Sequence, residues 1–427
     1  MDMMKRIIVV AAMLLLLAAL FGCGNSARVA APPEQNVSVA ETIDGVVFLD
    51  GSMSMQGFVN FPAATEYVDA IKNIEQALTL GWKNENLAYY RFGDRLQHID
   101  DEDRLRFAGY GFYGDLQTRL DVMVNDSDKE KLNFIVSDFL QTDQDFQKLV
   151  TAVKKNYFAN GKGAALIGVK GRFKGAVYDI GLAKEQFYYY SGDDKGRFRP
   201  FYILVLGEQR EVERFCRYYD QALAKDIERK VICLTDDLGG GKLEAEAVDY
   251  SKLDGIKTYA AVDDILAAGS AVPQYTLKSR PGSVYLRYDL TQGSPMVDDV
   301  QIKTALELWQ EQQQGFKKMM AVTAAKAEAD VRSDGFAVRI DFRPEVLPES
   351  GVYRFGLFLK PDMDSYKTMQ AGLLDDWTME DSFEISRGGV FQIDTTLELK
   401  KFIRNLSEVA YVSLHPHYKE RYVYFRY

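Results

Sequence analysis

Histidine is scarce in this chain. Only His98, His415 and His417 occur among 427 residues, so few side chains can act as a general base near neutral pH. His98 lies in a polar, acidic stretch typical of a surface, and the proline between His415 and His417 is more typical of a strand end than of a metal-binding pair. No G-x-S-x-G motif occurs either. The sequence therefore disfavours a serine hydrolase.

Cysteine is equally scarce, with three residues. Their spacing does not match zinc ligands. Cys216 falls in a helix expected over 211–224, and Cys233 in a strand expected over 231–234. Cysteines are often buried unpaired, and exported proteins also form disulfides, so both states remain open for this pair.

Runs of basic residues are missing as well. The net charge is −10, which argues against a nucleic-acid partner because phosphate backbones are bound by clustered Lys and Arg. Glycine-rich phosphate loops are also missing, since the glycines at 239–241 lack the Lys-Ser/Thr that would follow in such a loop.

A single long apolar run occurs, at residues 7–21 after Lys5 and Arg6. It is shorter than the roughly 20 residues that cross a bilayer as a helix, and it is typical of an export signal. The run ends in Phe21-Gly22-Cys23, which resembles the bacterial lipobox. The resemblance implies cleavage after residue 22, lipid on Cys23, and attachment to a membrane on its extracytoplasmic side.

Residues 23–42 are mostly small, polar or proline, with three valines as their larger apolar residues, and predict a flexible tether. The remaining chain, about 400 residues, is long enough for two domains. Strands and helices alternate over 43–272, with an insertion at about 171–200. This alternation predicts an α/β domain with a doubly wound, mostly parallel sheet. Over 273–427 the pattern predicts a β-rich, sandwich-like domain with one helix at 397–406.

Apolar runs and periodic spacing locate the individual elements. In the first domain we expect strands at 46–49, 87–92, 134–136, 164–169, 201–206 and 231–234, and helices at 64–78, 143–157 and 211–224. Short strands at 176–180 and 186–190 are expected in the insertion. In the second domain we expect strands at 284–289, 336–342, 351–359, 390–393, 409–414 and 422–427.

Polar side chains follow the first buried strand in the order Asp50-Gly51-Ser52-Met53-Ser54. Alternate positions of an extended loop place Asp50, Ser52 and Ser54 on one side, at the edge where open α/β sheets bind ligands. Carboxylate and hydroxyl oxygens suit Mg²⁺ or Mn²⁺. A capping turn would use the same residue types, but it would not require the later residues Thr118 and Asp138, which stand before a helix and after a strand.

This D-x-S-x-S motif, with the two later residues in chain order, resembles the metal-ion-dependent adhesion site of von Willebrand factor type A domains. The resemblance covers about residues 43–268. It implies that Ser52, Ser54 and Thr118 supply hydroxyl ligands to Mg²⁺ (or Mn²⁺), while Asp50 and Asp138 act largely through bound waters. One coordination position would stay open for a carboxylate of a protein partner.

Three residues of the loop before Thr118 extend this hypothesis, and one residue departs from the family pattern. Phe112 and Tyr113 could frame the partner, and Asp115 could substitute for or supplement Thr118. Phe139 stands directly after the second aspartate, where family members commonly have glycine.

The function we expect is non-enzymatic binding of a protein partner by a membrane-anchored lipoprotein. One alternative is a metal-dependent hydrolase resembling phosphatases. Those enzymes usually need an acid two residues after the first aspartate, and here that residue is Ser52. The other alternative is a scaffold whose cation site is structural or lost.

Overall fold

A computed structural model gives the fold. It describes residues 41–63, 65–139, 146–178, 188–190, 197–238, 244–246, 256–259, 274–277, 282–289, 302–312, 315–319, 324–332, 335–379 and 394–426. The expected signal segment, Cys23, most of the tether and the strand expected at 390–393 lie outside these residues. None of the described helices has the length and apolar character that a membrane crossing requires.

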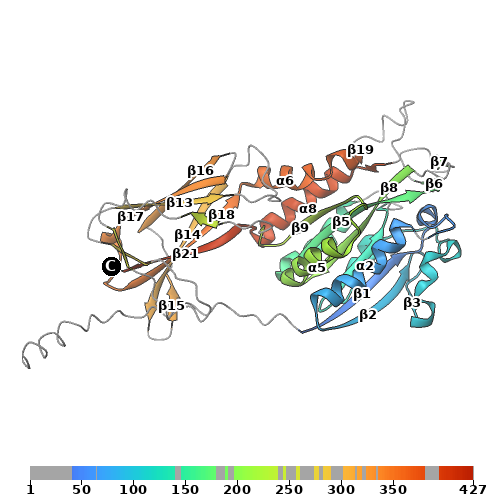
Figure 1. Cartoon of the computed structure of the whole chain (residues 1–427), viewed down its shortest axis with the longest axis horizontal. Helices are drawn as coiled ribbons and strands as arrows, with labels where there is room; N and C mark the ends of the chain where they lie inside the picture. Colours follow the sequence, from blue (N-terminus) through green and yellow to red (C-terminus); the bar gives the residue numbers. More distant parts are fainter. Residues whose placement is uncertain are drawn as a thin grey trace, which may run out of the picture.

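A seven-stranded sheet forms the first part of the chain (Figure 1). Its strands contain the six apolar runs expected there, because side chains buried on both faces favour continuous apolar sequence. In spatial order the strands are β3 (Gln97–Ile99), β2 (Asn84–Phe92), β1 (Thr42–Asp50), β4 (Leu132–Ser137), β8 (Arg197–Gly207), β5 (Gly163–Phe173) and β9 (Arg229–Leu234).

The sheet is mixed. Strand β1 runs parallel to β2 and β4, but β8 is antiparallel to both β4 and β5, and β9 is antiparallel to β5. Four strands, β1, β2, β4 and β5, therefore share one direction. The expectation of a mostly parallel sheet holds for these four strands, whereas β8 and β9 run in the opposite direction because each pairs with β5 as an antiparallel neighbour.

The connection between β5 and β8 carries a small hairpin. Strands β6 (Gly175–Val177) and β7 (Tyr188–Tyr190) pair antiparallel, at two of the short strands expected in the insertion. Residues 179–187 lie outside the described part of the chain.

Helices cover both faces of the seven-stranded sheet. Val47 and Leu49 of β1 belong to one apolar cluster, with α2 (Glu66–Gly81) and α5 (Gln209–Ala222). Val46 and Phe48 belong to the opposite cluster, with α3 (Leu120–Asp126) and α4 (Phe146–Asn156). Alternate residues of one strand thus enter separate cores, as the two-residue period of a strand requires.

The C-terminal part contains two larger sheets. The first is antiparallel throughout, with strands β10 (Glu244–Glu246), β13 (Gly282–Asp289), β17 (Gly335–Phe342) and β16 (Ala325–Arg332). The second is antiparallel except for the pair β12–β21, with strands β11 (Ile256–Tyr259), β12 (Gln274–Leu277), β21 (Tyr418–Arg426), β18 (Val352–Pro361), β14 (Ile302–Gln312) and β15 (Gly315–Lys318).

Helices α6 (Met363–Gly372) and α8 (Leu399–Leu414) lie between the β-rich end and the seven-stranded sheet (Figure 1). The strand expected at 409–414 is wrong, because these residues form the last turns of α8. Leu399, Phe402, Ile403, Leu406 and Ala410 recur at helical spacing and are all buried, so the apolar period of 409–414 continues that of the helix before it.

Contacts join the C-terminal part to the sheet domain. The Tyr202 hydroxyl donates to Thr396 Oγ1 at 2.9 Å, next to the short pair β19 (Thr378–Met379) and β20 (Thr396–Leu397). The Trp377 indole donates to Glu228 at 3.1 Å and is fully buried. The backbone of His417 also bonds to that of Asp236 and Leu238.

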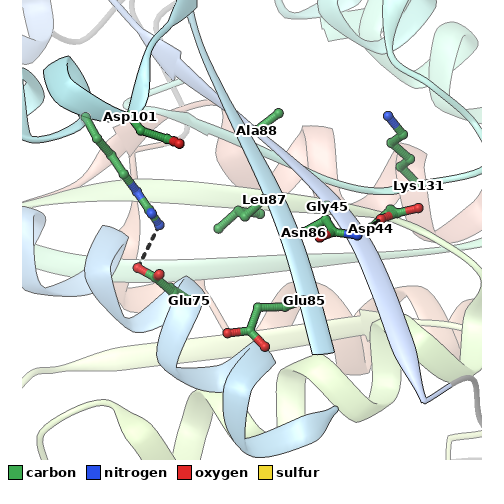
Figure 2. A pocket seen from close by; sticks show the side chains of 10 residues that line it. Asp44, Gly45, Glu75, Glu85, Asn86, Leu87, Ala88, Asp101 and Lys131 are labelled. Atoms are coloured by element: carbon green, nitrogen blue, oxygen red, sulfur yellow. Dashed lines mark hydrogen bonds and ion pairs between the residues drawn. The ribbon is translucent and has the colours of Figure 1, made fainter. Parts of the chain in front are cut away.

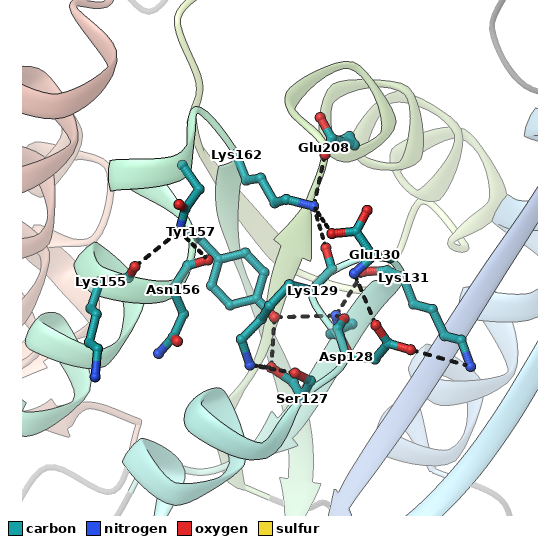
Figure 3. Close-up of polar contacts among 12 residues, drawn as sticks. Ser127, Asp128, Lys129, Glu130, Lys131, Lys155, Asn156, Tyr157, Lys162 and Glu208 are labelled. Atoms are coloured by element: carbon teal, nitrogen blue, oxygen red, sulfur yellow. Dashed lines mark hydrogen bonds and ion pairs between the residues drawn. The ribbon is translucent and has the colours of Figure 1, made fainter.

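A polar cluster lies at the end of the sheet where β4 and β5 begin (Figure 3). Ser127 Oγ and the Tyr157 hydroxyl lie 2.6 Å apart, and Asn133 Nδ2 donates to the same hydroxyl at 3.3 Å. Lys162 Nζ is 3.1 Å from Glu130 and 2.9 Å from Glu208. These bonds tie the start of β4 to the end of α4 and the start of β5.

Candidate divalent-cation site

The candidate site lies at the carboxyl edge of the parallel strands. Asp50 is the last residue of β1, and Asp138 directly follows β4. Because β1 and β4 are parallel neighbours, their ends meet at one edge. The Gly51 N–H donates to Phe92 O at 2.7 Å, which continues the β1–β2 pairing into the loop.

Two loops are joined by backbone bonds. The Met53 N–H donates to Asp115 O at 3.0 Å, and Gly51 O accepts from the N–H groups of Gly114 and Asp115 at 2.8 and 3.0 Å. The polypeptide before Thr118 therefore lies against the segment 51–53. After it, the 3-10 helix η1 (Met53–Phe58) buries Met55 and Phe58.

An ion pair crosses this junction. Arg91 Nη2 lies 2.7 Å from Asp115, and Arg91 Nε donates to Phe112 O at 2.8 Å. Two glycines leave room for the pair: a Cβ at Gly51 would lie 2.5 Å from Arg91 Nε, and a Cβ at Gly93 would overlap the Asp115 carboxylate.

The five residues predicted from sequence form one hydrogen-bonded cluster. Ser52 Oγ and Ser54 Oγ are 3.0 Å apart, and Ser54 Oγ donates to Asp138 Oδ1 at 3.2 Å. Thr118 Oγ1 lies 3.3 and 3.2 Å from the two oxygens of Asp50. The Ser52 N–H also donates to Asp50 Oδ1 at 2.9 Å. Residues from three separate segments (50–54, 118 and 138) thus meet around the carboxylates of Asp50 and Asp138.

Burial is graded across the cluster. Asp50 and Asp138 are 0 % exposed, whereas Ser52, Ser54 and Thr118 retain 5, 7 and 4 %. The hydroxyl side is therefore the side that reaches the surface.

Ser137 is a member of the cluster that sequence reasoning missed. Its Oγ donates to Asp50 Oδ2 at 2.7 Å and accepts from the Phe139 N–H at 3.1 Å. The sequence contained a pattern that could have identified it, because Ser137 is the polar residue that ends the apolar strand before Asp138.

Phe139 has a left-handed backbone, with φ of 61°. This conformation favours glycine, since a Cβ crowds the following carbonyl. Phe139 therefore adopts a backbone conformation that a glycine would adopt with less strain. Phe139 packs 5.2 Å from the ring of Tyr202 and 5.6 Å from that of Phe402 on α8.

The electrostatics of the cluster are dominated by burial. Removal from water, with a contribution from the nearby Asp138, raises the pKa of Asp50 from 3.8 to about 7, although the Ser137 and Ser52 hydrogen bonds oppose the shift. Two buried carboxylates near one another disfavour one another's charge, so bringing a positive charge to this cluster is favourable.

The donor chemistry fits a hard cation. Within the described residues, no group of three or more His, Cys, Asp and Glu side chains could hold a metal; this cluster instead has two carboxylates and four hydroxyls. Oxygen-only donors suit Mg²⁺ or Mn²⁺ and would not select zinc or copper. Ser52, Ser54 and Thr118 are the residues that could contact the ion.

The three residues expected near a partner differ in their positions. Phe112 is half-buried under the Arg91 guanidinium, 5.6 Å from its ring centre. Asp115 is paired with Arg91 as described. Tyr113 corrects the expectation: it is 3 % exposed, and its hydroxyl bonds to Tyr67 and Phe107 O, so its side chain belongs to the core beneath the site.

A hollow of about 450 Å³ lies elsewhere, along the first halves of β1 and β2 (Figure 2). Its lining includes Asp44, Glu85 and Asp101, together with Glu75, which pairs with Arg104 at 2.7 Å. None of the cluster residues lines it, so this hollow is separate from the candidate site.

No model of a protein family matches the chain, and no curated protein matches it either. The case for a function therefore rests on the geometry of the cluster.

Proposed function

We propose that this chain binds Mg²⁺, or Mn²⁺, at the cluster around Asp50 and through the ion recruits a carboxylate of a protein partner. The observation that carries the proposal is the convergence of Asp50, Ser52, Ser54, Thr118 and Asp138, predicted from three distant segments, in one buried cluster of oxygen donors. A capping turn around Asp50 would bring only the first three together.

Each group would have a distinct role. The hydroxyls of Ser52, Ser54 and Thr118 would contact the cation directly, from the side of the cluster that reaches solvent. Asp50 and Asp138 would hold it largely through water, and Ser137 orients Asp50. Neutral hydroxyl ligands leave the ion electron-poor, which favours an incoming Asp or Glu side chain. Bond-making chemistry plays no part.

The proposal extends to the fold and the location of the chain. We propose that the seven-stranded sheet domain is of the von Willebrand factor A type, with β8 inserted between β4 and β5, and that the two C-terminal sheets form a sandwich-like domain. Lipid on Cys23 and the tether to residue 42 would hold both at the outer side of a membrane.

Cation titration tests the proposal. Isothermal titration of Mg²⁺ and Mn²⁺ into the detergent-solubilised full chain should give saturable binding that is lost in Asp50→Ala and Ser54→Ala. Asp44→Ala is the matched control, because Asp44 is an exposed carboxylate at the other end of the same strand. Binding should then allow a cation-dependent pull-down of the partner.

Three results would reject it. Unchanged cation affinity in Asp50→Ala would place the ion elsewhere, and Mg²⁺-dependent turnover of a phosphate ester, lost in Asp50→Ala, would favour a hydrolase. An absence of cation binding to the parent chain, both alone and with acetate added as a carboxylate ligand, would favour a scaffold with a lost site.

A further inference from the structure

Arg199 reaches the candidate site from β8, a strand that runs against β1, β2, β4 and β5. Because β8 is antiparallel to β4, with Tyr202 opposite Ser137, the first residues of β8 run past the carboxyl end of β4. Arg199 Nη2 lies 3.8 Å from Asp138 Oδ2, and both side chains are 1 % exposed. A parallel β8 would have placed Arg199 at the opposite edge of the sheet.

The guanidinium is held in a closed environment. It lies over the ring of Phe173, 5.6 Å from the ring centre, and Phe173 is itself 1 % exposed. Burial lowers the pKa of Arg199, and the charge of Asp138 opposes that shift. An arginine stays protonated even so, so Arg199 is a permanent buried cation beside Asp138.

Arg199 changes the net formal charge of the candidate site. Asp50, Asp138 and a divalent ion would together be formally neutral, and Arg199 makes the loaded site singly positive. Without the ion, and with both carboxylates ionised, Arg199 leaves one net negative charge instead of two. Like charges in a region of low dielectric repel strongly, so Arg199 opposes cation binding and favours an anionic ligand on the bound cation.

We propose that Arg199 is a built-in counter-charge that weakens cation binding in the free protein and strengthens it when a carboxylate ligand is present. This inference rests on the proposed cation site. Arg199 does not touch the ligand in the proposal; it acts through Asp138 and is a positioning residue. The consequence is a site that loads cation and acidic partner together.

A charge series at position 199 tests the proposal in the full chain. Arg199→Met and Arg199→Gln remove the charge, and Gln keeps a hydrogen-bond donor toward Asp138; Arg199→Lys keeps the charge. Titration calorimetry with Mg²⁺ should show at least ten-fold tighter binding in the two neutral variants and parent-like binding in Arg199→Lys. Arg172→Met, which removes an arginine from a half-buried pair with Glu66, should leave cation affinity unchanged.

Two further readouts separate a charge effect from a packing effect. Without cation, Arg199→Met and Arg199→Gln should melt at lower temperature than the parent, and added Mg²⁺ should raise their midpoints more than the parent's. Acetate, used as a small carboxylate probe, should strengthen Mg²⁺ binding in the parent several-fold more than in Arg199→Gln.

The outcomes are distinct. Cation affinity that is equal or weaker in both neutral variants, with a parent that binds, would overturn the inference and leave the cation site standing. Binding in the neutral variants but not in the parent would support the counter-charge. An absence of binding in every variant would overturn both the site and the inference.

Discussion

At the scale of single residues, the carboxylate of Asp50 makes the site costly to keep empty. It is fully buried, and its pKa is raised to about 7 because burial disfavours its charge. Hydrogen bonds from Ser137, Thr118 and the Ser52 backbone offset part of that cost. A cation would relieve the remainder.

A pH dependence follows for the cation-free protein. The folded chain keeps a proton on Asp50 up to about pH 7, whereas the unfolded chain releases it near pH 3.8. Between these values the unfolded state binds fewer protons, so the free energy of unfolding falls as pH rises, by up to about 1.4 kcal/mol per pH unit. Urea unfolding at several pH values should show this decline, and Asp50→Asn should remove it.

Asp44→Asn is the matched control for this pH dependence. It removes an exposed carboxylate of the same strand and leaves the buried Asp50 unchanged. If the stability difference between the parent and Asp50→Asn were constant from pH 4 to 8, Asp50 would not titrate as described.

Phe139 allows a second test at this scale. Phe139→Ala should cost about 3–5 kcal/mol, because it removes the ring packed between Tyr202 and Phe402. Phe139→Gly should be about 1 kcal/mol more stable than Phe139→Ala, because glycine relieves the left-handed backbone. Chemical denaturation measures both.

The control for this pair is Phe134, a buried residue within β4. There glycine should be less stable than alanine, since strand backbone favours residues with a Cβ. The same order at positions 134 and 139 would contradict the role given to the backbone at Phe139.

At the scale of elements, the apolar runs of the first domain located its buried strands, whereas the direction of β8 could not be predicted from them. Apolar runs such as Phe201–Leu206 mark a buried strand, but burial is the same for parallel and antiparallel neighbours. The direction of β8 depends on the hairpin before it, where β6 and β7 are only three residues each. Arg199 could not be placed at the site for this reason.

The candidate site was predictable where its residues follow strand ends. Asp50 and Asp138 each follow an apolar run, so their meeting depends only on β1 and β4 being parallel neighbours. The burial of Tyr113 was not visible, because it depends on hydrogen bonds to Tyr67 and to the Phe107 backbone that link distant segments.

The polar cluster around Tyr157 should stabilise the sheet edge measurably. Tyr157→Phe removes the hydroxyl that Ser127 and Asn133 contact, and it should lower the free energy of unfolding by about 1–2 kcal/mol. Urea denaturation is the measurement. Tyr110→Phe is the control, since Tyr110 is 52 % exposed; an equal effect in both variants would argue against the cluster.

At the scale of the whole molecule, one apolar core spans both parts of the chain. The cluster that contains Val46 and Leu149 of the sheet domain also contains Tyr353 and Leu406 of the C-terminal part. Sequence composition suggested a boundary near residue 273, but apolar residues from both sides of that boundary pack together through α8.

Trp377 tests whether the two parts depend on one another. Its indole packs against Gly168 of β5, where an added Cβ would lie 2.7 Å from the ring, and it bonds to Glu228 beside β9. Trp377→Ala should cost about 3–5 kcal/mol and increase hydrogen exchange in β5 and β9. Val346→Ala, at an exposed position, should change neither; unaltered exchange in β5 and β9 of Trp377→Ala would show that the parts are independent.

The glycines beside the Arg91–Asp115 pair have a consequence for sequence tolerance. A side chain at position 51 or 93 would displace that pair. Positions 111 and 114, in the loop that contains Asp115, have open space where a Cβ would lie. In a library of random substitutions selected for folding, positions 51 and 93 should therefore accept almost nothing but glycine. Positions 111 and 114 should vary freely, so the loop can diversify its outer surface while its attachment to the sheet is preserved.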